Sequence, residues 1–413
     1  MSIAVETARV ALLGCGTVGR AFAALSRTTP AGTSPLQITG ALVRDTRRER
    51  SLDLPPLTED AQLLLGSEPD VLVELLGGTE PARSLVLQAL HQRVPVVTAN
   101  KTLLARFGAE LREAAHRTGT PLHYEAAVIA GVPFLGTFSR RPRAAGVTSF
   151  VGIVNGTSNF ILTRCASDSI SVADALADAQ HRGYAEPDPS DDVRGIDARD
   201  KLALLLQHFA QASVPLEGIE TRGLALVGRI QTAHARELGG TIKPIVSADW
   251  TRGAVDAFVG PAFVPIGHPL ADVDGVENAI VLHTPGGRLI FQGPGAGPEV
   301  TAATVLDDVE EVLGGSGRVP ARIESVRVTA PKTGWLVTLE ASRLPEGQDV
   351  ADLLASHGLF ASRTTATDTR SGRETRSLLF WPAHRQVLER ALASLCTAAG
   401  CTASAVRALE VKQ

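Results

Sequence analysis

The chain has 413 residues, of which 44% are hydrophobic, and its formal net charge of −4 arises from 40 basic and 44 acidic side chains. This length is sufficient for two or three domains that each bury a core. The mixed charges form no basic stripe, so we expect no nucleic-acid partner. No apolar run is long enough to span a bilayer or resembles a cleavable secretory signal, so we expect no membrane partner.

The four cysteines show no metal-ligand spacing; they are Cys15, Cys165, Cys396 and Cys401. The last two fall on one late predicted helix, and we interpret them as buried thiols and not as a disulfide. Unpaired thiols are typical of a reducing compartment, so we expect a cytoplasmic protein.

A glycine-rich turn follows the first predicted strand. Residues 8–13 read as a buried strand, and G-C-G-T-V-G then opens a helix that extends to about residue 26. Gly14 allows the tight turn, Gly16 lets a pyrophosphate approach the backbone, and Gly19 lets helix and strand pack closely. The helix N-terminus offers N–H groups to the phosphate. The pattern predicts a dinucleotide site, with a purely structural turn as the alternative.

The end of the second predicted strand, residues 37–43, bears on cofactor choice. Arg44 and Asp45 follow it directly. An acidic residue here binds the ribose 2′-OH of NAD, whereas an arginine favours the 2′-phosphate of NADP. Because Arg47 and Arg48 come next, we favour NADP over NAD. Solvated charges at the start of a helix are the alternative interpretation.

Two further predicted strands, residues 70–75 and 94–98, end in Gly77-Gly78 and in Ala99-Asn100-Lys101. Ligands lie beyond the carboxyl ends of parallel strands, so we expect Lys101 to reach the nicotinamide ribose or the substrate. A surface lysine at a helix start is the alternative. Predicted helices at 81–92 and 103–117 and a strand at 121–124 complete an α/β fold, a Rossmann-type doubly wound parallel sheet.

The segment 125–133 is small, apolar and irregular. Such backbone can direct carbonyl oxygens inward, as a monovalent or hard cation requires. A packed crossover between domains is the alternative.

The pattern changes from residue 147 onward and predicts an α+β domain with its helices on one face. A strand at 147–154 leads into the polar cap N-G-T-S-N of a helix, and another helix covers 172–182. Later strands are predicted at 242–248, 254–259, 276–282 and 288–292. The glycine-rich segment 293–297 then precedes a helix to about 313. We expect Gly297 to return the chain to the cofactor, with a hairpin exit as the alternative.

The most unusual stretch is 183–201, which reads G-Y-A-E-P-D-P-S-D-D-V-R-G-I-D-A-R-D-K. Its prolines disfavour helix, so we expect the carboxylates on a stiff, extended loop. A helix is predicted from about 192 to 212, and it places Asp197 and Lys201 on one face. Alone, such a pair is usually an exposed ion pair worth under about 1 kcal/mol. Together with the dinucleotide turn, it favours an active site.

With these motifs in place, residues 8–313 resemble homoserine dehydrogenase. The matching strings are G-C-G-T-V-G, E-L-L-G-G, T-A-N-K, N-G-T-S-N and the highly specific G-Y-A-E-P-D-P-S-D-D with its G-x-D-x-x-x-K continuation. The resemblance implies reversible NAD(P)-dependent reduction of L-aspartate 4-semialdehyde to L-homoserine. It also implies a place in threonine, methionine and isoleucine biosynthesis.

The resemblance assigns roles to individual residues. Lys201 is similar to the family's proton donor and Lys101 to its second active-site lysine, while Glu186 and Asp197 are similar to its substrate-binding carboxylates. We expect Glu186 to hold the substrate α-ammonium and Asp197 to orient the ammonium of Lys201. Backbone N–H groups are expected to hold the substrate carboxylate or to brace the loop; they belong to Asn155, Gly156 and Thr157.

The resemblance also covers the cofactor and a cation. It implies backbone contacts to the cofactor from Thr17 and Val18, and contacts from Thr98 and Lys101. It implies a sodium site formed mostly by carbonyl oxygens of Glu125, Val128, Ala130 and Val132. The family usually has smaller residues where this chain has Ile129-Ala130, but a carbonyl ligand tolerates substitution.

The C-terminal part follows a predicted linker at 314–320. Its predicted order is strand 334–341, helix 349–356, strands 360–367 and 375–381, helix 385–398 and strand 405–411, which is the β-α-β-β-α-β order of a ferredoxin-like module. In the family this is often an ACT module that senses threonine, although residues 344–347 differ from the usual ligand loop. The resemblance further implies a homodimer or homotetramer. We therefore expect a dinucleotide-binding domain at 1–130, completed by about 293–315, a substrate-binding and dimerisation domain at 131–292, and an ACT-like module at 321–413.

Two other functions compete with this hypothesis. A phosphorylating semialdehyde dehydrogenase requires a cysteine nucleophile with a histidine base. Cys15 lies in the dinucleotide turn, and Cys165 lies in a predicted helix with no adjacent histidine. An NADP-binding redox-sensing module without turnover gives no reason for Glu186, Asp197 and Lys201.

Overall fold

The computed structural model describes residues 7–28, 35–48, 54–132, 134–139, 146–295, 297–329, 332–370 and 372–409. Pro133, Ala296 and Val411, which belong to segments discussed above, lie outside these residues. The chain divides into two compact units. The first unit comprises Met1–Gly146, Ala203–Ser213 and Gly293–Ser325, and the second comprises Val147–Leu202, Val214–Gln292 and Val326–Gln413.

A six-stranded sheet forms the centre of the first unit. Its strands lie in the order β3 (Leu57–Thr58), β2 (Leu36–Leu42), β1 (Ala8–Leu13), β4 (Val71–Glu74), β5 (Val96–Thr98) and β6 (Leu122–His123). All five pairings are parallel. The order reverses between β1 and β4, which is the doubly wound arrangement, and this prediction is confirmed.

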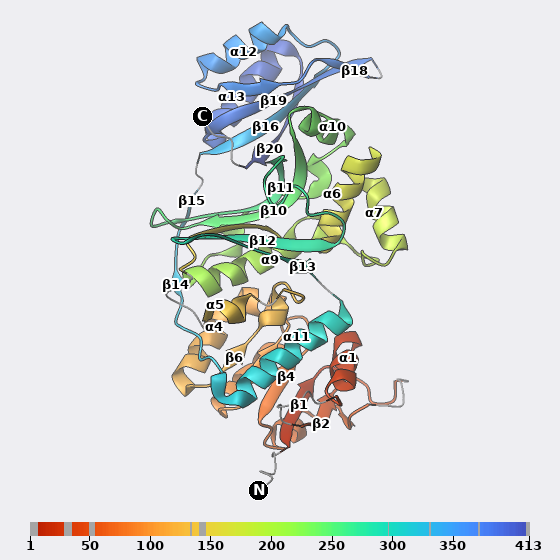
Figure 1. Ribbon diagram of the computed structural model, residues 1–413, viewed down its shortest axis with the longest axis vertical. Coiled ribbons are helices and arrows are strands. Elements are labelled where there is room, and N and C mark those ends of the chain that lie inside the picture. The colour runs from red at the N-terminus through yellow and green to blue at the C-terminus, as the bar shows by residue number, and fades with distance from the viewer. Residues whose placement is uncertain are drawn as a thin grey trace. The chain divides into compact units, whose positions relative to one another are not determined.

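Helices and short elements complete the first unit. They are α1 (Thr17–Leu25), α2 (Ala61–Leu65), α3 (Ala82–His91), α4 (Lys101–Thr118), η1 (Glu125–Ala127), α5 (Leu135–Ser139), η2 (Leu206–Ala210), β8 (Ala212–Ser213), α11 (Pro298–Glu311), η5 (Val312–Ser316) and β14 (Glu324–Ser325). Figure 1 shows α11, drawn in cyan, beside β4 and α1. Its Val305 and Val309 are fully buried with Leu12 of β1 and Phe22 of α1. Burial of this apolar face attaches α11 to the sheet, although most of the second unit separates them in sequence.

The second unit contains a twelve-stranded sheet. Its first part runs in the order β13 (Gly287–Pro294), β12 (Glu277–Thr284), β7 (Ser149–Ile153), β10 (Gly240–Asp249) and β11 (Val255–Pro265), with β9 (Glu220–Thr221) and β15 (Val328–Thr329) also paired to β11. The helices of this part are α6 (Gly156–Asp168), α7 (Val172–His181), α8 (Ser190–Val193), α9 (Ile196–Leu205), η3 (Leu216–Gly218), η4 (Leu224–Leu226) and α10 (Arg229–Glu237). Helix α10 was not predicted. Helices α6, α7 and α10 share one apolar core with β10 and β11.

The C-terminal part of the second unit has the predicted β-α-β-β-α-β order with one short strand added. Its elements are β16 (Thr333–Ala341), α12 (Gly347–Ser356), β17 (Ala361–Thr364), β18 (Asp368–Arg370), β19 (Arg373–Ala383), α13 (Arg385–Ala399) and β20 (Thr402–Ala408). The strands lie in the order β20-β16-β19-β17, and α12 and α13 bury one core with β16 and β19 (Figure 1). Strand β20 also pairs with β11 in parallel, so the sheet continues through both parts.

The prediction of one helix from 192 to 212 is wrong. Helix α8 ends at Val193, Gly195 adopts a left-handed φ of 78°, and α9 begins at Ile196. A left-handed residue cannot continue a right-handed helix, and glycine adopts this conformation without strain. Asp191 and Asp192 therefore lie on a short helical turn and not on an extended loop. After α9, η2 is a π-helical turn, a feature often found near functional sites.

No helix in the described part of the chain combines the length and apolar character that crossing a membrane requires. The cysteines Cys396 and Cys401 are free, with their sulfur atoms 3.4 Å apart. The prediction that both lie on one helix is wrong, because α13 ends at Ala399 before Cys401, and Cys396 is only partly buried.

Candidate functional site

The glycine turn of the first unit has the geometry of a phosphate cradle. Gly14 has a φ of +100°, and a Cβ added there would lie 2.6 Å from the carbonyl oxygen of Leu75. A Cβ added at Gly19 would collide with the carbonyl oxygen of Gly14. By contrast, nothing lies within 4 Å of a Cβ added at Gly16. The middle glycine is therefore open to a ligand, while the outer two hold the turn against β4 and α1.

A cavity of about 480 Å³ opens over this cradle. Thr17 lines it, as do the arginines Arg20, Arg44 and Arg48. Val18 instead packs against the core beneath. Asp45 accepts a hydrogen bond from the backbone N–H of Arg47 at 2.8 Å, so this carboxylate braces the turn after β2. The cavity therefore offers glycine backbone, a helix N-terminus and positive charge, which together suit the phosphates of a dinucleotide.

The carboxyl ends of β4 and β5 are joined by a buried network around Glu74. Its carboxylate accepts hydrogen bonds from the Thr98 hydroxyl at 2.6 Å and from the Leu76 backbone N–H at 2.8 Å. Burial raises the pKa of Glu74, and these bonds oppose the rise. Asn100 donates to Glu74 at 3.2 Å and caps α4. Lys101 is consequently the first residue of α4. The hydroxyl of Thr98 is engaged in its hydrogen bond to Glu74.

The predicted cation segment forms a closed loop around Glu125. The carboxylate of Glu125 accepts backbone N–H bonds from Phe134, Leu135 and Gly136 at 2.7–2.8 Å. Burial and the neighbouring Asp308 raise the pKa of Glu125 to about 7. The carbonyl oxygen of Ala130 accepts the hydroxyl of Thr304. The carboxylate thus accepts three backbone donors, so main-chain oxygens supply most of the oxygen ligands that this loop offers to a monovalent cation.

The other predicted residue of this unit, Gly297, is the N-cap of α11 and has a φ of 140°. In the same region a Cβ at Gly131 would collide with the carbonyl oxygen of Pro294. The close approach of this segment therefore requires glycine at position 131, whereas Gly297 requires glycine because of its φ.

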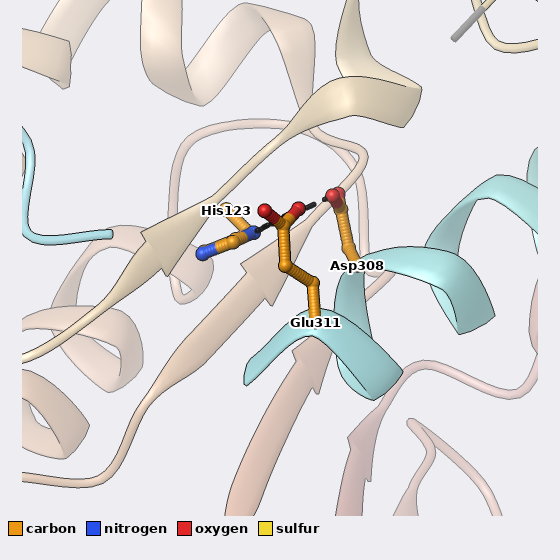
Figure 2. A group of neighbouring side chains, drawn as sticks. All are labelled: His123, Asp308 and Glu311. Atoms are coloured by element: carbon orange, nitrogen blue, oxygen red, sulfur yellow. Dashed lines mark ion pairs between the residues drawn. The ribbon is translucent and has the colours of Figure 1, made fainter. Parts of the chain in front are cut away.

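Figure 2 shows a second group with metal-ligand chemistry, His123 of β6 beside Asp308 and Glu311 of α11. The imidazole Nδ1 lies 3.5 Å from Asp308 and 3.8 Å from Glu311. Its Nε2 accepts the backbone N–H of Arg318 at 2.9 Å. A backbone N–H can only donate, so in the neutral ring the proton is on Nδ1. Since a metal would need the Nδ1 lone pair, we interpret the group as a structural network.

In the second unit, Lys201 lies in a polar network with Asp197, Asn155 and Asp192. The ammonium of Lys201 donates to the carbonyl oxygen of Val154 at 2.7 Å and lies 3.1 Å from the Asp197 carboxylate. The Asn155 amide nitrogen donates to that carboxylate at 2.8 Å and to Asp192 at 2.7 Å. The Asn155 side-chain oxygen accepts the Ser158 backbone N–H, so Asn155 also caps α6. Lys201 is only 9% exposed, so the pair is partly shielded from solvent.

The loop before α8 is attached to the N-terminus of α6. The Thr157 hydroxyl donates to the carbonyl oxygen of Tyr184 at 2.6 Å, and the Ser158 hydroxyl donates to that of Asp192 at 3.0 Å. A Cβ at Gly156 would lie 2.6 Å from the carbonyl oxygen of Val276, so this position requires glycine. Glu186 is exposed on the loop and lies outside the Lys201 network.

The thiol of Cys165 is not activated in this structure. Burial, with Asp174 contributing, raises the pKa of Cys165 to about 11. Cys15 is 6% exposed within the glycine cradle. A thiol with a raised pKa is a poor nucleophile, so Cys165 does not support a phosphorylating semialdehyde dehydrogenase.

Sequence reasoning missed three features of these sites. Arg20 lies one residue beyond the last glycine, and its place in the first turns of the helix was the available signal. The side chain of Asn155, and not its backbone, reaches Asp197, and Asp192 shares that amide. No local sequence pattern indicates that the carbonyl oxygen of Val154 accepts a hydrogen bond from Lys201, because this contact depends on how α9 packs against the end of β7.

A doubly wound sheet with an open glycine cradle, together with a shielded lysine–aspartate pair, defines the class of nicotinamide-dependent oxidoreductases. Two protein-family models match the chain: "Homoserine dehydrogenase, NAD binding domain" over residues 14–125 and "Homoserine dehydrogenase" over residues 133–309. The homoserine dehydrogenase of Synechocystis sp. is 39% identical over 321 residues, which cover 75% of this chain and 74% of that protein. The chain therefore belongs to the homoserine dehydrogenase family, and it is an oxidoreductase that uses a nicotinamide cofactor and a small-molecule substrate.

Solved structures agree with this placement. A homoserine dehydrogenase from Thiobacillus denitrificans has a TM-score of 0.89 at 29% identity, with 98% of this chain and 99% of that chain covered. A hyperthermophilic archaeal homoserine dehydrogenase in complex with NADPH has a TM-score of 0.62 at 23% identity, over 75% of this chain and 98% of that one. The second likeness extends to the fold alone.

Proposed function

We propose that this protein interconverts L-aspartate 4-semialdehyde and L-homoserine, with Lys201 as the proton donor in the reductive direction. The observation that carries the assignment is the shielded network of Lys201, Asp197 and Asn155. The bound nicotinamide supplies the hydride in reduction and accepts it in oxidation. A homoserine-dependent increase in the absorbance of reduced cofactor tests the proposal. Cofactor binding without turnover would instead favour the redox-sensing module.

The chemistry of Lys201 follows from its contacts. An ammonium has three N–H donors, and Val154 and Asp197 account for two of them. The third is available to the substrate oxygen, where it stabilises the developing alkoxide and transfers a proton. Asp197 fixes the position of the ammonium, and Asn155 fixes Asp197. In homoserine oxidation the same lysine accepts the proton.

Glu186 is proposed to hold the substrate α-ammonium. Its exposed position on the loop before α8 leaves the carboxylate accessible. We expect Glu186→Gln to raise the KM for homoserine by about tenfold or more and to change kcat less, because the lost contact is made in both ground and transition states. Asp191→Asn, an exposed carboxylate on the same segment, is the control. A wild-type KM in Glu186→Gln, or an equal rise in the control, would contradict the role.

The arginines of the cofactor cavity support a preference for NADP. Arg44 and Arg48 line the cavity, and Asp45 is bound to the backbone of its own turn. The archaeal structure with NADPH shows that a protein of this fold binds that cofactor. Arginine pairs well with a phosphate, so the 2′-phosphate is the distinguishing ligand group.

Arg44→Ser is therefore expected to raise the KM for NADP by about tenfold and to leave the KM for NAD nearly unchanged. Arg47→Ser removes an exposed arginine from the same turn that does not line the cavity, and it should leave both values near wild type. Initial rates with each cofactor provide the measurement. A parallel rise in both KM values would assign Arg44 to general phosphate binding and exclude the 2′-phosphate role.

We further propose sodium binding by main-chain oxygens of Val128, Ala130 and Val132 with Glu125 as the nearby buried charge. Support comes from the irregular, buried backbone of this loop and from a carboxylate whose pKa is raised by burial and Asp308. Rates in sodium chloride should exceed those in choline chloride at equal ionic strength. Equal rates would argue against the site.

The same proposal includes assembly and pathway. Family membership supports a homodimer or homotetramer, for which light scattering is the direct measurement, and a place in threonine, methionine and isoleucine biosynthesis. The element order and helix packing of the C-terminal part support an ACT-like module.

A further inference from the structure

The second unit contains a cavity of about 570 Å³ that the proposed reaction does not use. Its wall includes η3, β9 and β15, the helix α9, and two elements of the C-terminal part, α13 and β20. Four arginines line it: Arg199, Arg222, Arg385 and Arg407. Among the described residues, two acidic side chains, Glu217 and Glu220, line it with them. The wall therefore carries an excess of positive charge.

Three of these arginines converge on one carboxylate. Glu220 lies 2.8 Å from Arg222, 3.3 Å from Arg385 and 2.7 Å from Arg407. Burial opposes ionisation of Glu220, but Arg407 and Arg222 hold its pKa below the usual value. Burial lowers the pKa of Arg222, and Arg385 and Arg407 lower it further against the attraction of Glu220. The positive charges therefore repel one another at this point.

The remaining acidic neighbours contact individual arginines. Asp200 lies 3.1 Å from Arg199, Asp256 lies 3.5 Å from Arg407, and Glu389 lies 2.6 Å from Arg385. None of these three carboxylates lines the cavity. They offset much of the arginines' charge from outside the wall, so the wall presents guanidinium N–H groups to a ligand more than a net positive charge.

One buried donor at the wall is unsatisfied, and a helix without a side-chain cap begins beside it. The Nε of Arg407 has no hydrogen-bond partner among the described residues. The Arg407 side chain is only 7% exposed, so this N–H group is shielded from water as well. Helix α13 begins at Arg385, and its N-cap residue His384 provides no side-chain cap. No acidic residue occupies its first turn. A helix N-terminus and a desolvated guanidinium both favour a negatively charged group.

We propose that this cavity binds a small oxyanion, either the phosphate or the carboxylate group of a small metabolite. Arginine forks and helix N–H groups both bind such groups. The size of the cavity suits a small molecule. Glu217 and Glu220 limit the negative charge it accepts, so one anionic head group fits better than a polyanion. Binding of an anion in this cavity is independent of the proposed function, because it requires no catalytic turnover.

The test uses inorganic phosphate and succinate as probes on the full chain, with calorimetric titration and thermal unfolding at constant ionic strength. In wild type we expect saturable binding of one or both probes. The probe that binds more tightly identifies the preferred head group. Arg385→Gln, at a half-exposed side chain, should weaken this binding by about tenfold or more. Arg390→Gln, on the same helix but outside the cavity wall, should bind as wild type does. Glu217→Gln should tighten binding, because it removes a negative charge from the wall.

Arg44→Ser distinguishes the cavity from the cofactor site, which also attracts phosphate, and it should retain the binding. The proposal is overturned if neither probe binds wild type, if Arg385→Gln binds like Arg390→Gln, or if Arg44→Ser abolishes the binding. Thermal unfolding in chloride alone checks that each variant is folded. Should Arg385→Gln fail to fold, the effect of Glu217→Gln decides, and unchanged binding there would overturn the proposal.

Discussion

Replacing Lys201 with alanine is expected to lower kcat by about a hundredfold or more while the protein still binds its cofactor. General acid catalysis by a positioned side chain typically contributes a factor of this size. The buried ammonium is held by Val154 and Asp197, and alanine supplies neither its proton nor its charge. Initial rates of homoserine oxidation and NADPH titration, on wild type and variant, provide the measurement.

The exposed Lys332 provides a matched control, since Lys332→Ala also removes one lysine from the second unit. This variant should retain wild-type kcat. A Lys201→Ala enzyme with near-wild-type kcat would disprove the proton-donor role. A variant that loses NADPH binding as well would show general unfolding, in which case Lys201→Met, which keeps an apolar stem, separates the two effects.

Alanine variants of the glycine cradle should separate an effect on ligand binding from an effect on folding. Gly16→Ala is expected to weaken NADPH binding by about tenfold or more without changing the melting temperature. The added methyl group meets no protein atom within 4 Å, so it occupies space that the pyrophosphate needs. Fluorescence titration with NADPH and thermal unfolding measure the two effects separately.

Gly19→Ala is the contrasting variant. Its methyl group would collide with the carbonyl oxygen of Gly14, so both NADPH binding and the melting temperature should fall. If Gly16→Ala bound NADPH like wild type, the pyrophosphate would not approach this glycine. If it unfolded like Gly19→Ala, the open space at Gly16 would be filled in the protein in solution.

Local signals accounted for most of the fold. The strand–glycine–helix turn at Gly14–Gly19 and the Asn155 cap were predicted correctly, because each depends on residues within a few positions of one another. Periodicity also located the longer strands of the six- and twelve-stranded sheets, but it missed the short strands β3, β9, β15 and β18. It failed at Gly195, where a single left-handed residue ends α8, since the flanking residues read as one continuous helix. It also missed α10, a polar helix whose N-terminus lacks a side-chain cap from a serine or aspartate.

In the candidate site, too, short motifs predicted some features, and others depend on long-range packing. The sequence alone determined that this chain carries a dinucleotide turn and the residues Glu186, Asp197 and Lys201, because short motifs specify them. Only the tertiary structure decided that Asn155 bridges Asp192 and Asp197, from 37 and 42 residues away. It alone decided that Arg407 meets Glu220 across 187 residues and that β20 pairs with β11. Such contacts depend on how distant elements pack, and burial of their apolar faces decides that packing, which no local pattern encodes.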